Sequence, residues 1–267
     1  MKTMSDSQQV PVVAIILAAG FGMRFDPSDP KQLVSIAGKP VIEWSIEAFV
    51  DSPRITDVLL VVNPKVYAAV ERIVDDMGAD KVRGLIPGGE TRADSTRAAL
   101  GFLAQMGIPG DAKILIHDGV RPFVTPRIIQ DCDDALNASN AATVAVPSTD
   151  TILIAAPQDG AGAGSAPVVH AVPERSTTWR AQTPQCFRFD TIRSAYERAA
   201  SDENFHPTDD TRVVVDYLPG EKVTVVQGSD DNIKITTRAD VDVAELIAPR
   251  ARRVRTVARM RAARGGE

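Results

Sequence analysis

The sequence predicts an α/β fold with a mostly parallel β-sheet and helices on both of its faces. Patterns typical of buried strands alternate with amphipathic helical patterns through the first 147 residues. Apolar residues make up 44% of the 267 residues, so we expect residues 1–267 to form a single domain with its core at about 11–247. Ligands of such folds bind at the carboxyl ends of the strands, so a site is expected in the loops that leave them.

Each element of this region has its own signal. Short continuous apolar runs predict buried strands at 12–18 (VVAIILA), 57–63 (DVLLVVN), 82–86 (VRGLI), 113–119 (KILIHDG) and 141–147 (AATVAVP). Apolar residues at helical spacing predict helices at 40–50 (PVIEWSIEAFV), 65–78 (KVYAAVERIVDDMG), 91–107 (TRADSTRAALGFLAQMG) and 125–139 (TPRIIQDCDDALNAS). The second of these helices is expected to stop at Gly78.

The pattern changes from about residue 147. Two short β-like runs flank the turn APQDGAGAGSAP, which predicts a β-arm over about 147–180 that projects from the sheet. A two-stranded arm is only marginally stable alone, so we expect it to pack on a second copy of the chain. After the arm we expect a helix at 190–202, a loop at 204–211, strands at 222–228 and 232–236, and a terminal helix from about Ala239.

Composition and the chain ends bound the class of protein. No stretch resembles a signal peptide or a membrane span, which favours a cytoplasmic protein with no membrane partner. Cys132 and Cys186 lack metal-ligand spacing, so two small buried residues are expected. Seven arginines lie between Arg250 and Arg264. We interpret this basic tail, about 249–267, as a solvated extension in preference to a nucleic-acid site.

The stretch IILAAGFGMRFDPSDPKQ follows the first strand. It matches neither the P-loop nor the dinucleotide fingerprint, but its small residues leave backbone N–H groups free to converge on phosphate oxygens. Arg24 and Lys31 add positive charge. The alternative is a tight strand-to-helix turn with two solvated cations.

Two other loops also carry polar groups. Asp118 ends the fourth strand and Arg121 follows three residues later, so the two side chains can orient each other. The carboxylate suits a phosphate-bound Mg²⁺, and a purely structural Asp–Arg pair is the alternative. In GGETRADS, the helix expected after the third strand begins with an N-cap-like Thr91, and Ser95 lies one turn inside it; anion binding and a plain helix start both fit.

The remaining candidates carry weaker signals. Arg175 and Lys234 are cations near turns, and Thr151 fits a β-strand as well as a ligand site. The stretch HPTDD is interpreted as a polar turn rather than a metal site. No Ser-His-Asp or Cys-His set is present in a recognisable pattern, so nucleophilic catalysis by a side chain is not indicated.

Six segments occur in one order along the chain: LAAGFGMRF…PKQ…GKPVIEW, GGETRADS, HDGVRPF, PSTDT, ERSTTWRAQTPQCF and DNIKIT. Together they closely resemble the 2-C-methyl-D-erythritol 4-phosphate cytidylyltransferases of the non-mevalonate isoprenoid pathway, over about residues 11–247. The resemblance implies a Rossmann-like nucleotidyltransferase that transfers CMP from CTP to a polyol phosphate and releases pyrophosphate. It further implies a β-arm exchanged across a homodimer and Mg²⁺ as the cofactor, although other divalent cations fit too.

Carried over by position, the resemblance implies a role for each candidate residue. The implied CTP-binding residues are Ala18, Ala19, Gly20, Phe21, Gly22, Gly89, Ser95 and Asp118. The implied catalytic residues, all of them cations, are Arg24, Lys31, Arg175 and Lys234. The implied substrate-binding residues are Arg121, Thr151 and Arg175. Asp118 is also the implied contact of the metal, and Thr151 and Arg175 are expected to reach the neighbouring chain's site from the arm.

The chain departs from the family pattern in one motif, and two other functions stay open. Gly119 stands where the family usually has alanine, which is expected to loosen the backbone beside Asp118. Ribitol-5-phosphate cytidylyltransferases resemble the chain in the same loops, and the stretch ERSTTW favours the erythritol enzyme over them. A non-catalytic nucleotide-binding or RNA-associated protein is the third possibility. The presence of Arg24, Lys31, Asp118, Arg175 and Lys234 together argues against it.

Overall fold

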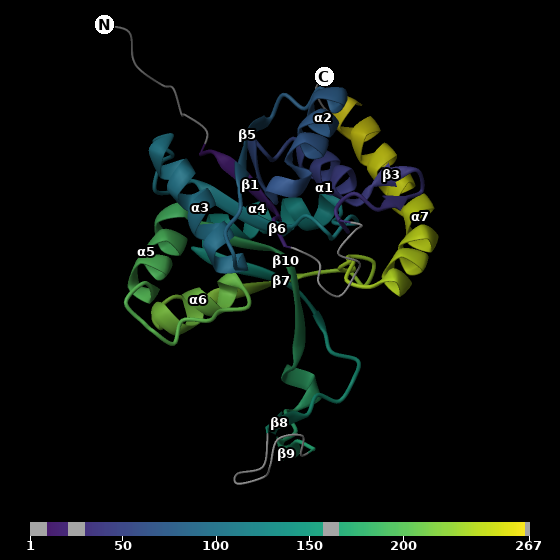
Figure 1. Cartoon of the computed structure of the whole chain (residues 1–267). Helices are drawn as coiled ribbons and strands as arrows, with labels where there is room; N and C mark the ends of the chain where they lie inside the picture. The colour runs from purple at the N-terminus through teal and green to yellow at the C-terminus, as the bar shows by residue number, and fades with distance from the viewer. Residues whose placement is uncertain (1–9, 21–29, 157–165, 265–267) are drawn as a thin grey trace, which may run out of the picture.

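The computed structural model describes residues 10–20, 30–156 and 166–264 (Figure 1). Their centre is a seven-stranded sheet in the order β11-β7-β10-β6-β1-β4-β5. Its strands are β1 (Val12–Ala18), β4 (Asp57–Val62), β5 (Val82–Pro87), β6 (Lys113–Asp118), β7 (Ala141–Pro147), β10 (Trp179–Arg188) and β11 (Val223–Gln227). All neighbouring pairs are parallel except those of β10, which runs antiparallel to β6 and β7. The predicted α/β fold with a mostly parallel sheet is confirmed.

Helices cover both faces of the sheet, as the alternation of elements predicted (Figure 1). Alternate residues of β1 enter opposite cores: Ile16 packs in one apolar cluster and Ile15 in the other. The first cluster takes in residues of α1 (Val41–Val50), α2 (Tyr67–Met77) and α4 (Pro126–Ala138). The second takes in residues of α3 (Arg92–Gln105), α5 (Phe189–Ala199) and α6 (Asp210–Tyr217). The short pair β2 (Ser35–Ile36) and β3 (Lys39–Pro40) precedes α1.

Sequence patterns missed β10, α6 and the short pair β2 and β3, and they predicted one strand that is not formed. Strand β10 was not predicted because polar residues and Pro184 interrupt it, and its pairing with β7 shifts register between Ala181 and Gln185. Helix α6 lies where a loop was expected to end. The strand predicted at 232–236 is wrong, because this segment bonds to side chains and loops instead: the Asn232 amide donates to the Thr183 carbonyl, and the Ile235 N–H donates to that of Val120.

The C-terminal helix α7 (Arg238–Arg264) packs against α1 and includes the basic tail. Arg255 is 6% exposed, and its guanidinium donates to the carbonyls of Trp44 and Pro122. Arg259 pairs with Glu47 and Asp51. The expectation of a solvated extension is therefore wrong for this face of the helix, because the arginines find carboxylates and carbonyls on their own chain.

The β-arm leaves the sheet from β7 and returns to it as β10 (Figure 1). Its described part contains the antiparallel strands β8 (Ile154–Ala156) and β9 (Val168–Ala171). Large apolar side chains on it are exposed: Ile152, Leu153, Ile154, Val168, Val169 and Val172. In Figure 1 this strand pair lies away from the seven-stranded sheet.

Two further expectations concern the whole chain. Cys132 and Cys186 are fully buried and free, as predicted. Over the described ranges, none of the helices has the length and apolar content needed to cross a membrane.

Candidate active site

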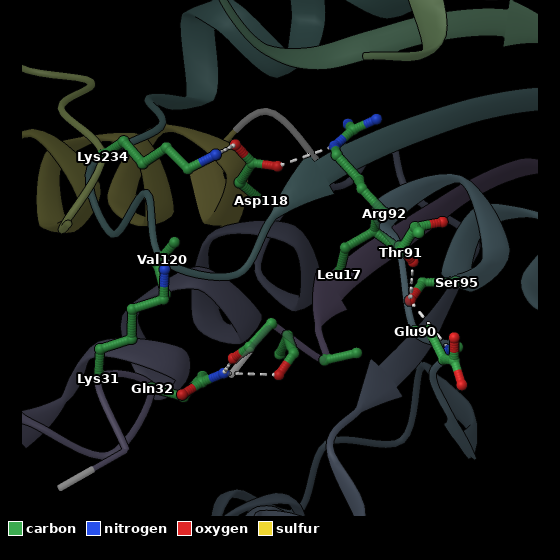
Figure 2. A pocket seen from close by; sticks show the side chains of 14 residues that line it. Leu17, Lys31, Gln32, Glu90, Thr91, Arg92, Ser95, Asp118, Val120 and Lys234 are labelled. Atoms are coloured by element: carbon green, nitrogen blue, oxygen red, sulfur yellow. Dashed lines mark hydrogen bonds and ion pairs between the residues drawn. The ribbon is translucent and has the colours of Figure 1, made fainter. Parts of the chain in front are cut away.

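A pocket of about 190 Å³ lies at the carboxyl edge of the sheet, beside the loops that follow β1, β5 and β6 (Figure 2). These loops meet because the carboxyl ends of parallel strands share one edge. The pocket is lined by Leu17, Ala18, Ala19, Gly20, Lys31, Gln32, Gly89, Glu90, Thr91, Arg92, Ser95, Asp118, Val120 and Lys234.

Two buried amides hold the first wall, the start of the loop after β1. The Gln32 side chain donates to the carbonyls of Ala18 and Gly20, both at 2.8 Å. The Asn63 side chain donates to the carbonyl of Ala19 at 3.1 Å. With three consecutive carbonyls engaged, the peptide groups of this wall are fixed in orientation.

The amino end of α3 forms the second wall. Thr91 caps the helix in a capping box with Asp94, and the Ser95 hydroxyl donates to the Thr91 carbonyl and accepts from the Gly89 N–H. Gly88 is required here, because a Cβ at this position would lie 2.1 Å from the Cβ of Ala19. The close approach brings a helix amino end, where N–H groups and the helix dipole favour anions, against the first wall.

Asp118 is the carboxylate at the end of β6, and three cations surround it. Lys234 Nζ lies 2.9 Å from Oδ2 and Arg92 Nε lies 3.4 Å from Oδ1 (Figure 2). Arg121 Nε lies 3.5 Å from Oδ2. Burial alone raises the pKa of this carboxyl, but the three positive charges outweigh burial and hold the pKa well below its usual range. The carboxylate therefore stays ionised at neutral pH.

The strand ends beneath Asp118 are joined by a chain of hydrogen bonds. The Asp118 N–H donates to Thr183 Oγ1, which lies 3.0 Å from His117 Nδ1, and His117 Nε2 lies 3.0 Å from the Arg121 carbonyl. A carbonyl only accepts, so Nε2 carries the proton and Nδ1 accepts from Thr183. Burial lowers the pKa of His117 to about 4, which keeps the ring neutral.

The backbone beside Asp118 is also tied down, contrary to the expectation for Gly119. The Gly119 N–H donates to the Leu17 carbonyl at 2.8 Å, and its carbonyl accepts from the Ser45 hydroxyl at 3.0 Å. A glycine is tolerated here without loose backbone because both of its peptide groups are engaged. The carboxylate thus sits on a fixed strand end.

Comparison with known proteins identifies the family. Residues 12–250 match the family model described as 2-C-methyl-D-erythritol 4-phosphate cytidylyltransferase. The chain belongs to this family. It is 59% identical over 242 residues to a 2-C-methyl-D-erythritol 4-phosphate cytidylyltransferase of Bifidobacterium longum (strain DJO10A), covering 91% of this chain and 81% of the relative. The protein is therefore a cytidylyltransferase.

A solved structure and a more distant relative agree with this assignment. The 4-diphosphocytidyl-2C-methyl-D-erythritol synthase of Anaerococcus prevotii DSM 20548 superposes with a TM-score of 0.74 at 28% identity, covering 90% of this chain and 96% of that chain. A bifunctional ribulose 5-phosphate reductase/CDP-ribitol pyrophosphorylase of Haemophilus influenzae is 34% identical, covering 87% of this chain and 47% of the relative. The lower identity of this relative makes the ribitol enzyme the less supported alternative.

The pocket at the carboxyl edge of the sheet brings together most of the site residues predicted from the sequence. Those that line it are Ala18, Ala19, Gly20, Lys31, Gly89, Ser95, Asp118 and Lys234. Arg121 lies behind Asp118, where it donates to the Asn232 carbonyl, and it is not in the lining. Thr151 and Arg175 are exposed on the arm, away from the pocket. Phe21, Gly22 and Arg24 lie outside the described residues.

Sequence reasoning gave no role to three polar residues of this pocket, Gln32, Glu90 and Arg92. Gln32 occurs in the segment PKQ, and Glu90 and Arg92 occur in GGETRADS. The sequence around Gln32 does not indicate that its side chain binds the carbonyls of Ala18 and Gly20. Arg92 was hidden because its partners come from residues distant in sequence.

Proposed function

We propose that this cytidylyltransferase transfers CMP from CTP to 2-C-methyl-D-erythritol 4-phosphate, giving 4-diphosphocytidyl-2-C-methyl-D-erythritol and pyrophosphate. One observation carries the proposal: two lysines and a helix amino end line a pocket beside an ionised Asp118. This combination suits a triphosphate. The name of the Bifidobacterium relative supplies the substrate class.

The reaction needs no general base. The nucleophile is a phosphate monoester, whose second pKa is about 6, so it is an oxyanion at neutral pH. The barrier lies in bringing this oxyanion to the α-phosphorus of CTP, where the new P–O bond forms as the bond to pyrophosphate breaks. Fixed positive charge and backbone N–H groups reduce that barrier.

The lining cations divide this work. Lys31 comes from the segment that follows the first loop and Lys234 from the segment before α7, so the two reach the pocket from different parts of the chain. Lys234 is bound to Asp118 and half exposed, and we assign it to the α-phosphate. We assign Lys31 to the charge that builds up between the α- and β-phosphates. The amino end of α3 and the loop after β1 hold the nucleotide.

The carboxylates of the pocket can bind a divalent cation, Mg²⁺ in this proposal, only if water and substrate supply the other ligands. Asp118 and Glu90 are the carboxylates of the pocket lining, and the described residues contain no group of three metal-ligating side chains. Mg²⁺ commonly takes one or two carboxylates and completes its shell with water and substrate phosphates. Asp118 would hold it with the triphosphate, and the bound ion would neutralise phosphate charge.

The test is pyrophosphate release from CTP and Mg²⁺, with 2-C-methyl-D-erythritol 4-phosphate and ribitol 5-phosphate in parallel and ATP, GTP and UTP as controls. We expect rapid release with CTP and the methylerythritol substrate alone, and its loss on chelation of the metal. Preference for ribitol 5-phosphate would move the protein to the alternative function. No release with either would contradict catalysis.

The same proposal includes a homodimer built through the β-arm. The arm exposes Leu153 and Val172 at 56% and 57%, values that a strand pair in water does not favour without a partner. A second copy of the chain is the occupant that carries the same apolar side chains, as a two-fold interface requires. Arg175 and Thr151 would then lie near the partner's pocket.

The dimer is tested with Leu153→Asp/Val169→Asp, two exposed positions whose change should leave the monomer folded. Light scattering is expected to give a dimer for the wild type and a monomer for the variant, and the control Met106→Asp, exposed at the carboxyl end of α3 and outside the arm, should stay dimeric. A wild-type monomer would contradict the proposed homodimer.

We place the reaction in the cytoplasm, where cell fractionation is expected to find the protein.

A further inference from the structure

Asp210 is a fully buried carboxylate in the stretch HPTDD, which the sequence patterns assigned to a polar turn. A buried charge is costly unless it is paired and hydrogen bonded. Asp210 accepts hydrogen bonds from Arg92 Nη1 at 2.5 Å, Thr96 Oγ1 at 3.0 Å and Tyr196 Oη at 2.6 Å. A buried carboxylate with three hydrogen-bond donors is more than a polar turn requires, which indicates a further role of Asp210.

Arg92 links Asp210 to the pocket. Besides Asp210, its guanidinium donates to Gln185 Oε1 at 3.4 Å through Nη2 and to Asp118 Oδ1 at 3.4 Å through Nε. Gln185 Oε1 also accepts from the Asp210 N–H at 2.9 Å, which closes the network. All three nitrogens of the guanidinium therefore face groups of the protein, and the side chain is not set up primarily to hold a phosphate.

The network joins the second wall of the pocket to the end of β6. Arg92 starts α3, whose amino end is this second wall, and Asp118 ends β6 (Figure 2). Asp210 and Gln185 hold the guanidinium from α6 and β10. A planar guanidinium reaches two carboxylates at once in fixed geometry, which a lysine ammonium does not do.

We propose that Arg92, anchored by Asp210, is a positioning residue that sets the Asp118 carboxylate at a fixed place relative to the amino end of α3. The proposal rests on the proposed function, in which Asp118 acts on the triphosphate. Without Asp210, Arg92 keeps one carboxylate partner and turns fully toward Asp118. Asp118 then leaves its place, and the misplaced groups slow the chemical step more than they weaken CTP binding.

The test uses Asp210→Asn, Arg92→Lys, their double variant, and Arg97→Gln as the control. Arg97 lies on the same helix and pairs with Asp94 at the surface. We expect kcat to fall about thirtyfold in both single variants, with KM for CTP within about threefold of the wild type. The double variant should fall about as far as either single one, since both act through one network. The control should keep the wild-type rate.

A crystal structure of each single variant gives the readout that does not depend on activity. The inference expects the Asp118 carboxylate to move relative to the amino end of α3. An unmoved Asp118, or wild-type kcat in either folded variant, overturns it. If Asp210→Asn does not fold, Arg92→Lys carries the same two measurements. If the wild type itself releases no pyrophosphate, the proposed function fails, and the position of Asp118 still decides the inference.

Discussion

The pocket and the β-arm satisfy their charged and apolar groups in opposite ways. Asp118 is paired with three cations of its own chain, and the side chains behind the pocket are buried in clusters. On the arm, Arg175 is exposed with no side-chain partner among the described residues, and large apolar side chains face outward. The charge of Asp118 is thus balanced within one chain, whereas the arm leaves a cation and large apolar side chains exposed.

The largest expected effect concerns the pocket side of this comparison. Lys31→Ala should lower kcat about a thousandfold, or about 4 kcal/mol in the barrier, because a positioned charge near the reacting phosphates is lost. Steady-state kinetics measures the loss, and circular dichroism should show an unchanged fold. Lys65→Ala, an exposed lysine on η1 (Pro64–Val66), is the control. Near-wild-type turnover would remove Lys31 from the mechanism.

The next largest effect is on stability, and it tests whether Arg255 anchors α7 to the segments that support the pocket. Arg255→Ala should destabilise the protein by about 3 kcal/mol, because it leaves two buried carbonyls without their donor and removes one of the cations that pair with Glu47. Urea denaturation gives the free energy of unfolding. The exposed Arg261→Ala on the same helix should change it by less than about 0.5 kcal/mol. Equal stability of the two variants would show that the buried arginine does not anchor α7.

The arm side of the comparison is tested by Arg175→Ala. If Arg175 serves the partner's pocket, kcat/KM for the polyol phosphate should fall about thirtyfold, or about 2 kcal/mol, with no loss of stability. Arg72→Ala, exposed on α2, should match the wild type.

Mixing the Arg175→Ala and Lys31→Ala proteins sharpens this result. In a mixed dimer one site would combine an intact pocket with an intact arm, so random exchange should restore about a quarter of the wild-type rate. A mixture that stays inactive after exchange would place Arg175 in its own chain's site.

The smallest effect is the acid dependence of stability. Burial raises the pKa of Glu47, but Lys39 and Arg255, helped by Arg259, lower it more, so the net pKa lies below its ordinary value. The stability that Glu47 provides is therefore present above about pH 4.5 and is lost as the pH falls through the lowered pKa. Glu47→Gln should show a shallower fall of unfolding free energy from about pH 5 to pH 3 than the wild type. Parallel curves would contradict the pairing.

The sequence predicted what depends on local pattern, and it failed where distant residues meet. The parallel strands, the Thr91 cap, the Asp118–Arg121 pair and the projecting arm follow from apolar periodicity, capping residues and strand-end polarity. The strand β10 was hidden by its polar residues, because partners on both sides rather than its own composition make it a strand. The buried side of α7 was not predicted either. Its arginines were expected to be solvated, because the sequence does not show that Glu47 and the carbonyls of Trp44 and Pro122 face them.

The same distinction between local pattern and distant contact holds for the candidate site residues. Eight of the residues that the resemblance carried over line one pocket, whereas Arg121, Thr151 and Arg175 do not line it. Arg92 and Asp210 are 118 positions apart, and no local pattern connects an arginine at one helix start to an aspartate at another. Only the folded chain brings these two side chains into contact.

The burial of Arg255 also has a meaning for how the protein is made. Trp44 and Arg255 are separated by 211 positions, and the Pro122 carbonyl that Arg255 binds belongs to the segment after Asp118. A nascent chain emerging from the ribosome can assemble β1, α1 and β6 long before this arginine is synthesised. The turn of α7 that carries Arg255 therefore closes the support beneath the pocket only after the loops of the pocket have been synthesised, and a chain that stops before Arg255 would carry those loops without the helix that braces them.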